Sequence, residues 1–243
     1  MITNPQSGTN VHEIADGIYR INTPVHLPDG QAFNFNQYLI VDDEPVLFHT
    51  GPRAMHPLVR QAIAAVMPLE RLRYLGLSHV EADECGALDL LMADAPQAVP
   101  LCSRVAAMVS IGDLSPRPPR ALADGEQLVI GRRTLVWHDT PHVPHGWDCG
   151  LMSELTTGTF FCGDLYTQGG PGTEPIVESD IVGPSEAFRA SMDYYAHAPH
   201  TAATLERLAQ TRPRTLACMH GSAWRGDGAA LLRHLAVALG ARR

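Results

Sequence analysis

The sequence contains no lysine and no apolar run long enough to span a bilayer. All 18 basic residues are arginine, and together with 26 acidic residues they give a formal net charge of -8 at pH 7. This charge argues against nucleic acid or an anionic membrane surface as the main partner, although a bound metal would change the local sign. We therefore expect neither nucleic-acid nor membrane binding.

Cysteine is scarce, and its spacing excludes two kinds of site. The five cysteines are scattered, odd in number and form no C-x-x-C pair, so neither a zinc ribbon nor a disulfide framework is indicated. The first ten residues are polar and lack the apolar core of a signal peptide. We expect residues 1–10 to be a flexible lead-in, residues 11–243 to form one domain, and the protein to be cytoplasmic.

Histidine, in contrast, is abundant, with 12 residues, and one of them lies in the most informative segment. Residues 78–85 (SHVEADEC) place His79 and the carboxylates Glu81, Asp83 and Glu84 within six residues. The apolar pattern predicts a buried strand at 74–77 before this cluster and a helix at 83–93 within and after it. Imidazole nitrogen and carboxylate oxygen bind borderline and hard divalent metals. The cluster therefore indicates half of a metal site.

Three later segments also place ligand-type side chains after predicted strands. His142 and His145 occur in TPHVPHG, Asp164 follows the apolar run FFCG, and His220 follows the run ACM. Open sheets bind ligands at the carboxyl ends of their strands. Each of these residues alone is typical of a turn or a solvated position, but the ordered set of four segments indicates one metal centre.

The ordered set resembles the ligand pattern of the metallo-β-lactamase superfamily. Most hydrolases of that superfamily carry H-x-H-x-D-H, whereas H-x-E-x-D, with Glu81, is similar to the diiron domain of flavodiiron proteins. Residues 35–41 with the turn after them, residues 191–196 (SMDYYA) and residues 220–225 (HGSAWR) also resemble that family. The resemblance implies an α/β fold, a four-layered αββα sandwich in a single domain, with a dinuclear metal site at one edge of the paired sheets.

The resemblance also implies a ligand set, which is divided between two metal ions. The first ion takes His79, Glu81, His145 and a bridging Asp164, and the second takes Asp83, residue 84, the same Asp164 and His220. The family places its histidine just before a turn rich in Gly or Pro, which favours His145 over His142. His142 then lies behind a ligand or faces the substrate.

Two positions depart from the family pattern. Both groups of relatives have histidine at position 84, where this chain has Glu84. If Glu84 binds, three histidines and four carboxylates form an oxygen-rich site that favours iron or manganese over zinc. If it is instead a first-turn helix acid facing solvent, the second ion lacks a ligand. His49 stands before Thr-Gly, where the superfamily has Asp, and either orients a ligand through its ring N–H or marks a changed site.

The expected function is that of a dinuclear metal protein, with iron favoured and zinc or manganese as alternatives, that binds or reduces O2 or a related small oxidant. Asp83 and Glu84 are the expected catalytic residues. One alternative is a metallo-hydrolase of a lactone, thioester or phosphoester, in which the metals activate a bridging water and Asp83 orients it or acts as a base. The other alternative is a degenerate metal-binding sensor.

Flavodiiron proteins continue into a flavodoxin-like domain that supplies FMN. The resemblance therefore leads us to expect no FMN site within this chain and a separate electron donor, if electrons are needed. The expected partners are O2 or a small-molecule substrate. The sequence leaves the oligomeric state open, with a homodimer among the expected assemblies.

Overall fold

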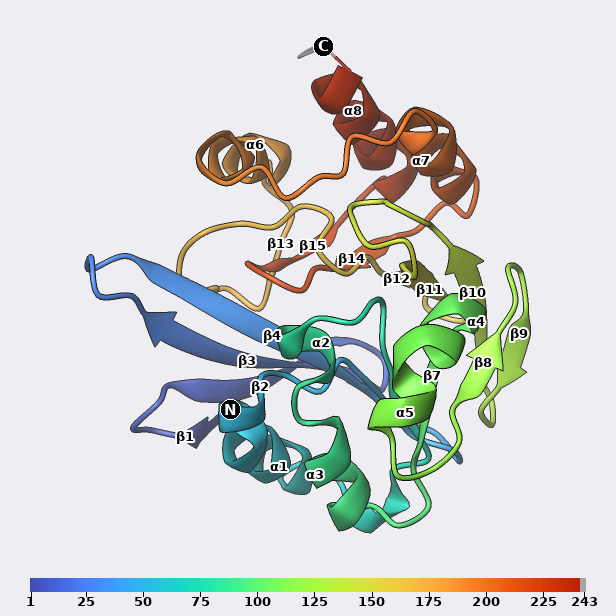
Figure 1. Ribbon diagram of the computed structural model, residues 1–243. Helices are drawn as coiled ribbons and strands as arrows, with labels where there is room; N and C mark the ends of the chain where they lie inside the picture. The colour runs from blue at the N-terminus through green and yellow to red at the C-terminus, as the bar shows by residue number, and fades with distance from the viewer. Residues whose placement is uncertain (241–243) are drawn as a thin grey trace.

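A computed structural model describes residues 1–240 of the chain. Two β-sheets pack face to face, and helices cover both outer faces (Figure 1). The first sheet contains, in spatial order, β1 (Ile2–Asn4), β2 (Thr9–Ala15), β3 (Ile18–His26), β4 (Ala32–Ile40), β5 (Val46–Phe48), β6 (Tyr74–Gly76), β7 (Val99–Ser103) and β8 (Arg120–Leu122). The second contains β13 (Ile176–Val177), β15 (Ala223–Arg225), β14 (Thr215–Ala217), β12 (Thr159–Phe161), β11 (Gly150–Glu154), β10 (Thr134–Asp139) and β9 (Gln127–Val129).

Strand β4 shows why the sheets are layered in this way. Its Tyr38 and Ile40 point into the core between the sheets, whereas Leu39 between them points to the outer face and packs in the cluster under the helices. Successive side chains of a strand point to opposite faces, so an unbroken apolar run predicts a strand buried on both sides. The rings of Tyr38 and Phe161 meet across the sandwich with centroids 5.8 Å apart.

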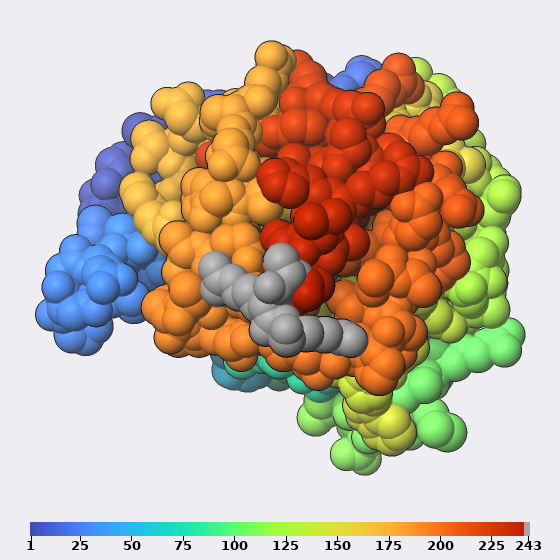
Figure 2. All heavy atoms as spheres, turned by 90° about the horizontal axis from the view of Figure 1, so that it is seen from above, coloured from blue at the N-terminus to red at the C-terminus, as the bar shows by residue number. Residues whose placement is uncertain are grey.

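Three helices, α6 (Val182–Ser191), α7 (Thr201–Ala209) and α8 (Gly228–Gly240), cover the second sheet (Figures 1 and 2). Helices α1 (His56–Ala64) and α3 (Leu88–Asp94) cover the first. The remaining helical turns are η1 (Arg53–Met55), η2 (Leu69–Arg71), α2 (Ala82–Cys85), α4 (Arg104–Ala106), η3 (Ala107–Ile111) and α5 (Gly112–Leu114). This arrangement confirms the expected αββα sandwich. Among the described residues, no helix combines the length and apolar character needed to cross a membrane.

The structure corrects the expectation of a flexible lead-in at residues 1–10. Strand β1 lies in this segment and pairs antiparallel with β2, and the backbone N–H of Val11 donates to the carbonyl of Met1 at 2.8 Å. The segment therefore forms the edge of the first sheet. Its polar composition fits an edge strand, because the outer side of such a strand faces water.

The helix expected over residues 83–93 is divided into α2 and α3 around Gly86 and Ala87. The backbone N–H of Ala87 donates to the carbonyl of Gly51 at 3.1 Å and to the Thr50 hydroxyl at 3.2 Å. A Cβ on Gly86 would come within 3.0 Å of the Arg53 backbone nitrogen. The turn after β5 thus packs directly against the helix break, which fixes the orientation of the acidic turn that precedes it.

Candidate metal centre

The expected ligand residues lie together at one edge of the sandwich, on four segments that follow strand ends. His79, Glu81, Asp83 and Glu84 follow β6 of the first sheet. The other three, which follow β10, β12 and β14 of the second sheet, are His145, Asp164 and His220. Seven residues from distant parts of the sequence therefore meet where the two sheets face each other.

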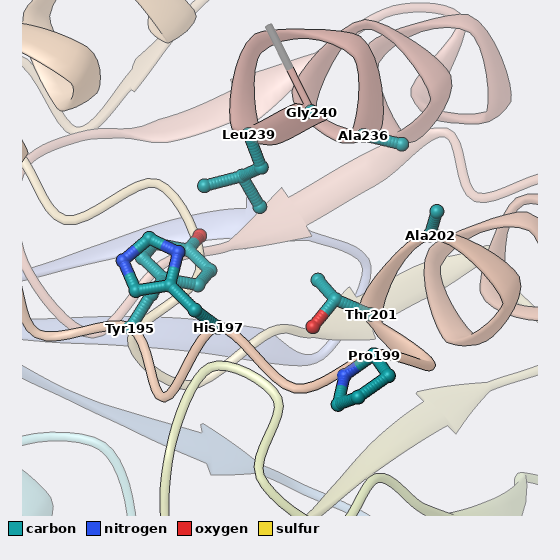
Figure 3. A pocket seen from close by; sticks show the side chains of 8 residues that line it. All are labelled: Tyr195, His197, Pro199, Thr201, Ala202, Ala236, Leu239 and Gly240. Carbon is teal, nitrogen blue, oxygen red and sulfur yellow. The ribbon is translucent and has the colours of Figure 1, made fainter. Parts of the chain in front are cut away.

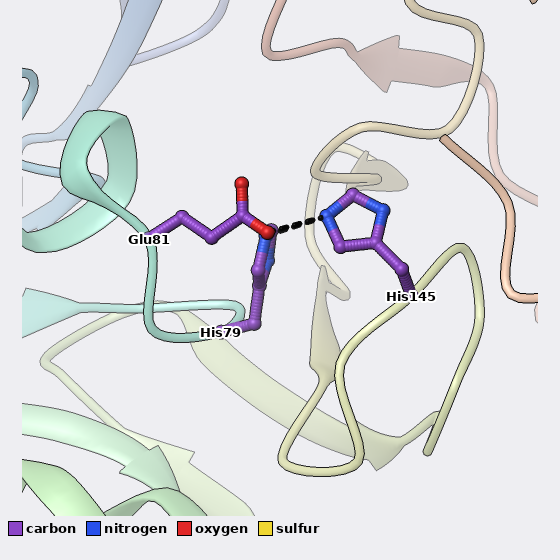
Figure 4. Close-up of side chains that lie close together, drawn as sticks. All are labelled: His79, Glu81 and His145. Carbon is purple, nitrogen blue, oxygen red and sulfur yellow. Dashed lines mark hydrogen bonds and ion pairs between the residues drawn. The ribbon is translucent and has the colours of Figure 1, made fainter. Parts of the chain in front are cut away.

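The first donor group is centred on His145. Its Nε2 lies 3.1 Å from Glu81 Oε1 and 3.0 Å from His79 Nε2 (Figure 4). The same nitrogen lies 3.4 Å from Asp164 Oδ2. His79 Nε2 also lies 3.4 Å from Asp164 Oδ2. Ligands bonded to one ion at about 2.0–2.2 Å lie about 3–4 Å from one another. The spacing of these four side chains therefore suits one metal ion.

The second donor group uses the other oxygen of Asp164. Asp164 Oδ1 lies 3.4 Å from His220 Nε2, which lies 3.4 Å from Asp83 Oδ2. The two oxygens of one buried carboxylate thus face two separate sets of donors. This is the geometry that a carboxylate needs to bridge two metal ions.

Glu84 points into the cluster, which excludes the alternative of a helix acid that faces solvent. Its side chain is 0% exposed, and Oε2 lies 3.8 Å from His79 Nε2. Donor atoms of Glu84 lie within 4.8 Å of donor atoms of His79 and Asp164, and also of Glu81 and Asp83. The backbone is held from behind, since the Thr50 N–H and hydroxyl both donate to the carbonyl of Glu84, at 2.7 and 3.0 Å.

The cluster contains buried oxygens whose polarity is not balanced by protein hydrogen bonds. Both carboxylate oxygens of Glu84 and Oδ1 of Asp164 form no hydrogen bond to any residue in the described range 1–240. Burying a carboxylate without a partner is costly, and proteins compensate by pairing it or by binding metal. Three imidazoles and four carboxylates around these oxygens fit two divalent cations.

The pKa shifts of the donor residues also indicate a site for cations. Burial, together with the charge of Asp164, raises the pKa of Glu84 well above its usual range. Burial alone would lower the pKa of His220, but contacts with Asp164 and Asp83 outweigh it and raise that pKa to about 9. Hydrogen bonds from His145 and His79 lower the pKa of Glu81 to about 2. Protons must therefore neutralise the cluster whenever cations do not.

Residues behind the ligands fix the direction of their rings. The Nδ1 of His220 lies 2.8 Å from the backbone carbonyl of Asn34, to which it can donate, so its Nε2 is free to face Asp164. His79 Nδ1 lies 2.9 Å from the Ser78 hydroxyl, which lies 2.9 Å from His49 Nε2. Burial lowers the pKa of His49 to about 3, so this ring is neutral at physiological pH. His49 thus reaches a ligand through Ser78 rather than directly.

Some of these supporting residues were missed by sequence reasoning. Ser78 directly precedes His79, and a hydroxyl beside a candidate ligand is a usable signal. Asn34 acts through its backbone carbonyl, which no sequence pattern reveals. Phe33 and Phe35 pack against the His220 ring at centroid distances of 4.5 and 5.4 Å, forming an apolar wall beside the second donor group.

The structure places the side chain of His142 outside the donor cluster. Its side chain is exposed, and its ring lies 6.4 Å from that of His200. No hydrogen bond or ion pair within residues 1–240 joins its ring to the donor cluster. Its backbone N–H donates to the carbonyl of Gly146 at 2.7 Å, which closes the loop that carries His145. His142 therefore shapes this loop with its backbone while its side chain turns outward.

A cavity of about 140 Å³ lies elsewhere, between the segment before α7 and the end of α8 (Figure 3). Its lining residues are Tyr195, His197, Pro199, Thr201, Ala202, Ala236, Leu239 and Gly240. None of the seven donor residues lines it. The donor cluster, and not this cavity, is the candidate functional site.

Comparisons with known proteins agree with this fold and site. Residues 33–221 match the model of the ODP family beta lactamase, and this range includes all seven donor residues. Among curated proteins, the chain is 28% identical over 201 residues to rubredoxin-oxygen oxidoreductase of Megalodesulfovibrio gigas, covering 79% of this chain and 49% of that protein. It is also 28% identical over 214 residues to the anaerobic nitric oxide reductase flavorubredoxin of Pectobacterium atrosepticum, covering 83% of this chain and 41% of that protein. The chain thus spans less than half the length of these relatives.

Solved structures show the same fold. The rubredoxin oxygen:oxidoreductase of Desulfovibrio gigas has a TM-score of 0.80 at 22% identity, covering 95% of this chain and 60% of that chain. A diflavin flavoprotein fragment from Nostoc has a TM-score of 0.84 at 20% identity, with 96% of each chain covered. The family match extends over most of the chain, and the fold is that of the flavodiiron core structures. The chain belongs to the ODP family of β-lactamase-like proteins, whose relatives here are flavodiiron proteins.

Proposed function

We propose that this chain is a dinuclear metal protein, with iron as the favoured metal, that binds or reduces O2 or a related small oxidant. The observation that carries the proposal is the position of Asp164, whose two oxygens face His79 and His145 on one side and His220 on the other. A single carboxylate between two donor sets is suited to hold two ions close together.

In this proposal, His79, Glu81, His145 and Asp164 hold the first ion. Asp83, Glu84, His220 and the shared Asp164 hold the second. Four carboxylates balance the charge of two divalent ions, and the oxygen-rich donor set favours iron or manganese over zinc. Iron bound there would supply reversible electron transfer and could bind a small oxidant.

The surrounding residues control access and protons. The side chains of Glu81 and Asp83 are 52% and 22% exposed, so this side of the cluster is open to solvent and to a small substrate. The ring of Phe33 packs against that of His220, with centroids 4.5 Å apart, and places an apolar surface beside the second donor group. Asp83 lies at the open side and is the group we assign to move protons to or from the oxidant, whereas buried Glu84 would add negative charge to the donor set of the second ion.

The named activities of the relatives support an oxidoreductase. Their names give oxygen and nitric oxide as substrates, but this chain covers less than half of each, so the complete reaction of those proteins is not transferred. We propose that electrons come from a separate donor or a neighbouring subunit, and that no FMN site lies within this chain.

Metal analysis of protein purified with and without oxygen tests this function. We expect two irons per chain, a visible absorption band that changes when the reduced protein meets O2, and O2 consumption when a chemical reductant is supplied. Asp164→Asn should abolish all three. Tightly bound zinc together with turnover of a lactone, thioester or phosphoester would instead support a hydrolase and overturn the proposal.

A further inference from the structure

Three side chains form a hydrogen-bonded row behind His79, on the side away from its metal-facing nitrogen. His79 Nδ1 lies 2.9 Å from Ser78 Oγ, Ser78 Oγ lies 2.9 Å from His49 Nε2, and His49 Nδ1 lies 2.9 Å from Met219 Sδ. All four side chains belong to residues that are at most 2% exposed. The row connects the end of β6 in the first sheet with the segment that follows β14 in the second.

The chemistry of Met219 determines the direction of every bond in the row. A thioether sulfur can accept a hydrogen bond but cannot donate one. His49 must therefore carry its proton on Nδ1 to bond Met219. Because this ring is neutral, its Nε2 then has a free lone pair and accepts the single hydroxyl proton of Ser78.

The remaining bond follows from the limited number of protons. Once the Ser78 hydroxyl has donated to His49, it can only accept from His79, so the proton of His79 is on Nδ1. When His79 is neutral, as a metal ligand must be, this leaves the lone pair of its Nε2 directed at the cluster, where Nε2 lies 3.4 Å from Asp164 Oδ2. The reverse direction would place a proton on Nε2 and prevent this histidine from binding a metal.

We propose that Met219, acting through His49 and Ser78, fixes the tautomer and orientation of His79 and so prepares it to bind the first metal ion. These three are positioning residues and do not touch the metal. The Asp that the superfamily has at position 49 can only accept a hydrogen bond. A histidine at this position has two tautomers and needs a partner such as Met219 to select one of them. The inference rests on the dinuclear site of the proposed function, but it depends neither on iron nor on O2.

Two variants and one control test this proposal, with Zn²⁺ as the probe and chelator competition to measure affinity. Ser78→Ala interrupts the row and should weaken binding of one of the two ions by about 10–100-fold, the range for residues that orient a metal ligand. Met219→Leu removes the acceptor at similar volume and should give a smaller loss. Ser153→Ala is the matched control, because its hydroxyl lies 2.8 Å from another buried histidine, His138, away from the cluster. It should leave Zn²⁺ affinity unchanged.

The protonation of His49 provides a second readout that does not depend on metal binding or activity. Nitrogen-15 NMR of the wild-type side chain should show the Nδ1–H tautomer, and Met219→Leu should convert it to a mixture with Nε2–H. An Nε2–H tautomer in the wild-type protein would overturn the proposal, and so would wild-type Zn²⁺ affinity in both variants. If the protein bound no second ion at all, the proposed function would fail, while the tautomer of His49 would still decide the existence of the row.

Discussion

The carboxylate of Glu84 is shielded from solvent and lies 3.8 Å from the Nε2 of His79. The family resemblance leads one to expect histidine at this position, so the chain replaces a neutral donor by an acidic one inside the cluster. The exchange adds a negative charge and a hard oxygen donor between the two sets of ligands. Its consequences for stability and metal preference can be measured.

Glu84→Gln should stabilise the metal-free protein and destabilise the metal-loaded one. The pKa of Glu84 is raised in the folded state, so its contribution to stability is complete below its unfolded value, near pH 4.5, and is lost as pH rises through the folded value. Glutamine has no such loss, so its stability advantage over glutamate in the metal-free protein should grow as the pH rises above about 4.5.

Thermal unfolding of both proteins at several pH values checks this expectation. An increase of about 1 kcal/mol in the free energy of unfolding raises the unfolding temperature by about 2–4 °C in a domain of this size. With two equivalents of metal added, the order should reverse, because glutamine is a weaker ligand. If the metal-free Glu84→Gln variant unfolds at the wild-type temperature at pH 8, then buried Glu84 does not destabilise the metal-free protein at that pH.

Glu84→His should keep two ions but change their identity. The substitution exchanges a hard oxygen donor for imidazole and leaves three carboxylates, so the preference for iron over zinc should fall. Competition between Fe²⁺ and Zn²⁺ under anaerobic conditions measures the ratio directly. An unchanged ratio would mean that residue 84 does not bind either ion.

Asp164→Asn should weaken both metal sites together, by about 100-fold or more, because one side chain serves both donor groups. Asparagine has nearly the same volume as aspartate and leaves the neighbouring ligands in place. The change in metal affinity therefore reports the loss of the negative charge and of the second carboxylate oxygen. His142→Ala is a suitable control, since this histidine is exposed and lies beside His200 rather than in the cluster. Loss of only one ion in Asp164→Asn would exclude a bridging role.

Metal affinity should continue to rise with pH up to about pH 9. The pKa of His220 in the metal-free protein is raised to about 9, so below that pH a cation must displace a proton from this ring before it binds. An unperturbed histidine would give a plateau above about pH 6.5–7. Zn²⁺ competition titrations between pH 6 and pH 9 distinguish the two curves, and a plateau by pH 7 would contradict the electrostatic account.

Much of the fold and of the donor cluster could be predicted because both depend on local patterns. The run around Tyr38 to Ile40 is apolar on both faces, which predicts a buried strand, and polar residues directly after strands predicted the edge where the donors meet. The helix break at Gly86 could not be predicted, since it depends on hydrogen bonds from a turn more than thirty residues earlier in the chain.

The contacts that support the ligand residues also could not be predicted from the sequence. His49 was recognised as a departure from the family, but its path to His79 requires Ser78 and Met219 to meet across two sheets. His142 and His145 are only three residues apart, and the loop turns one outward and the other inward. Their spacing in the sequence does not show which of the two histidines is the ligand, because the backbone conformation between them decides which side chain faces the cluster.

Anaerobic titration of metal-free protein with Fe²⁺, followed by Mössbauer and electron paramagnetic resonance spectroscopy, tests the central claim most directly. We predict uptake of two ions per chain and magnetic coupling between them, transmitted through the carboxylate of Asp164. Uptake of a single ion, or of two ions without magnetic coupling, would contradict a bridged dinuclear centre in this chain.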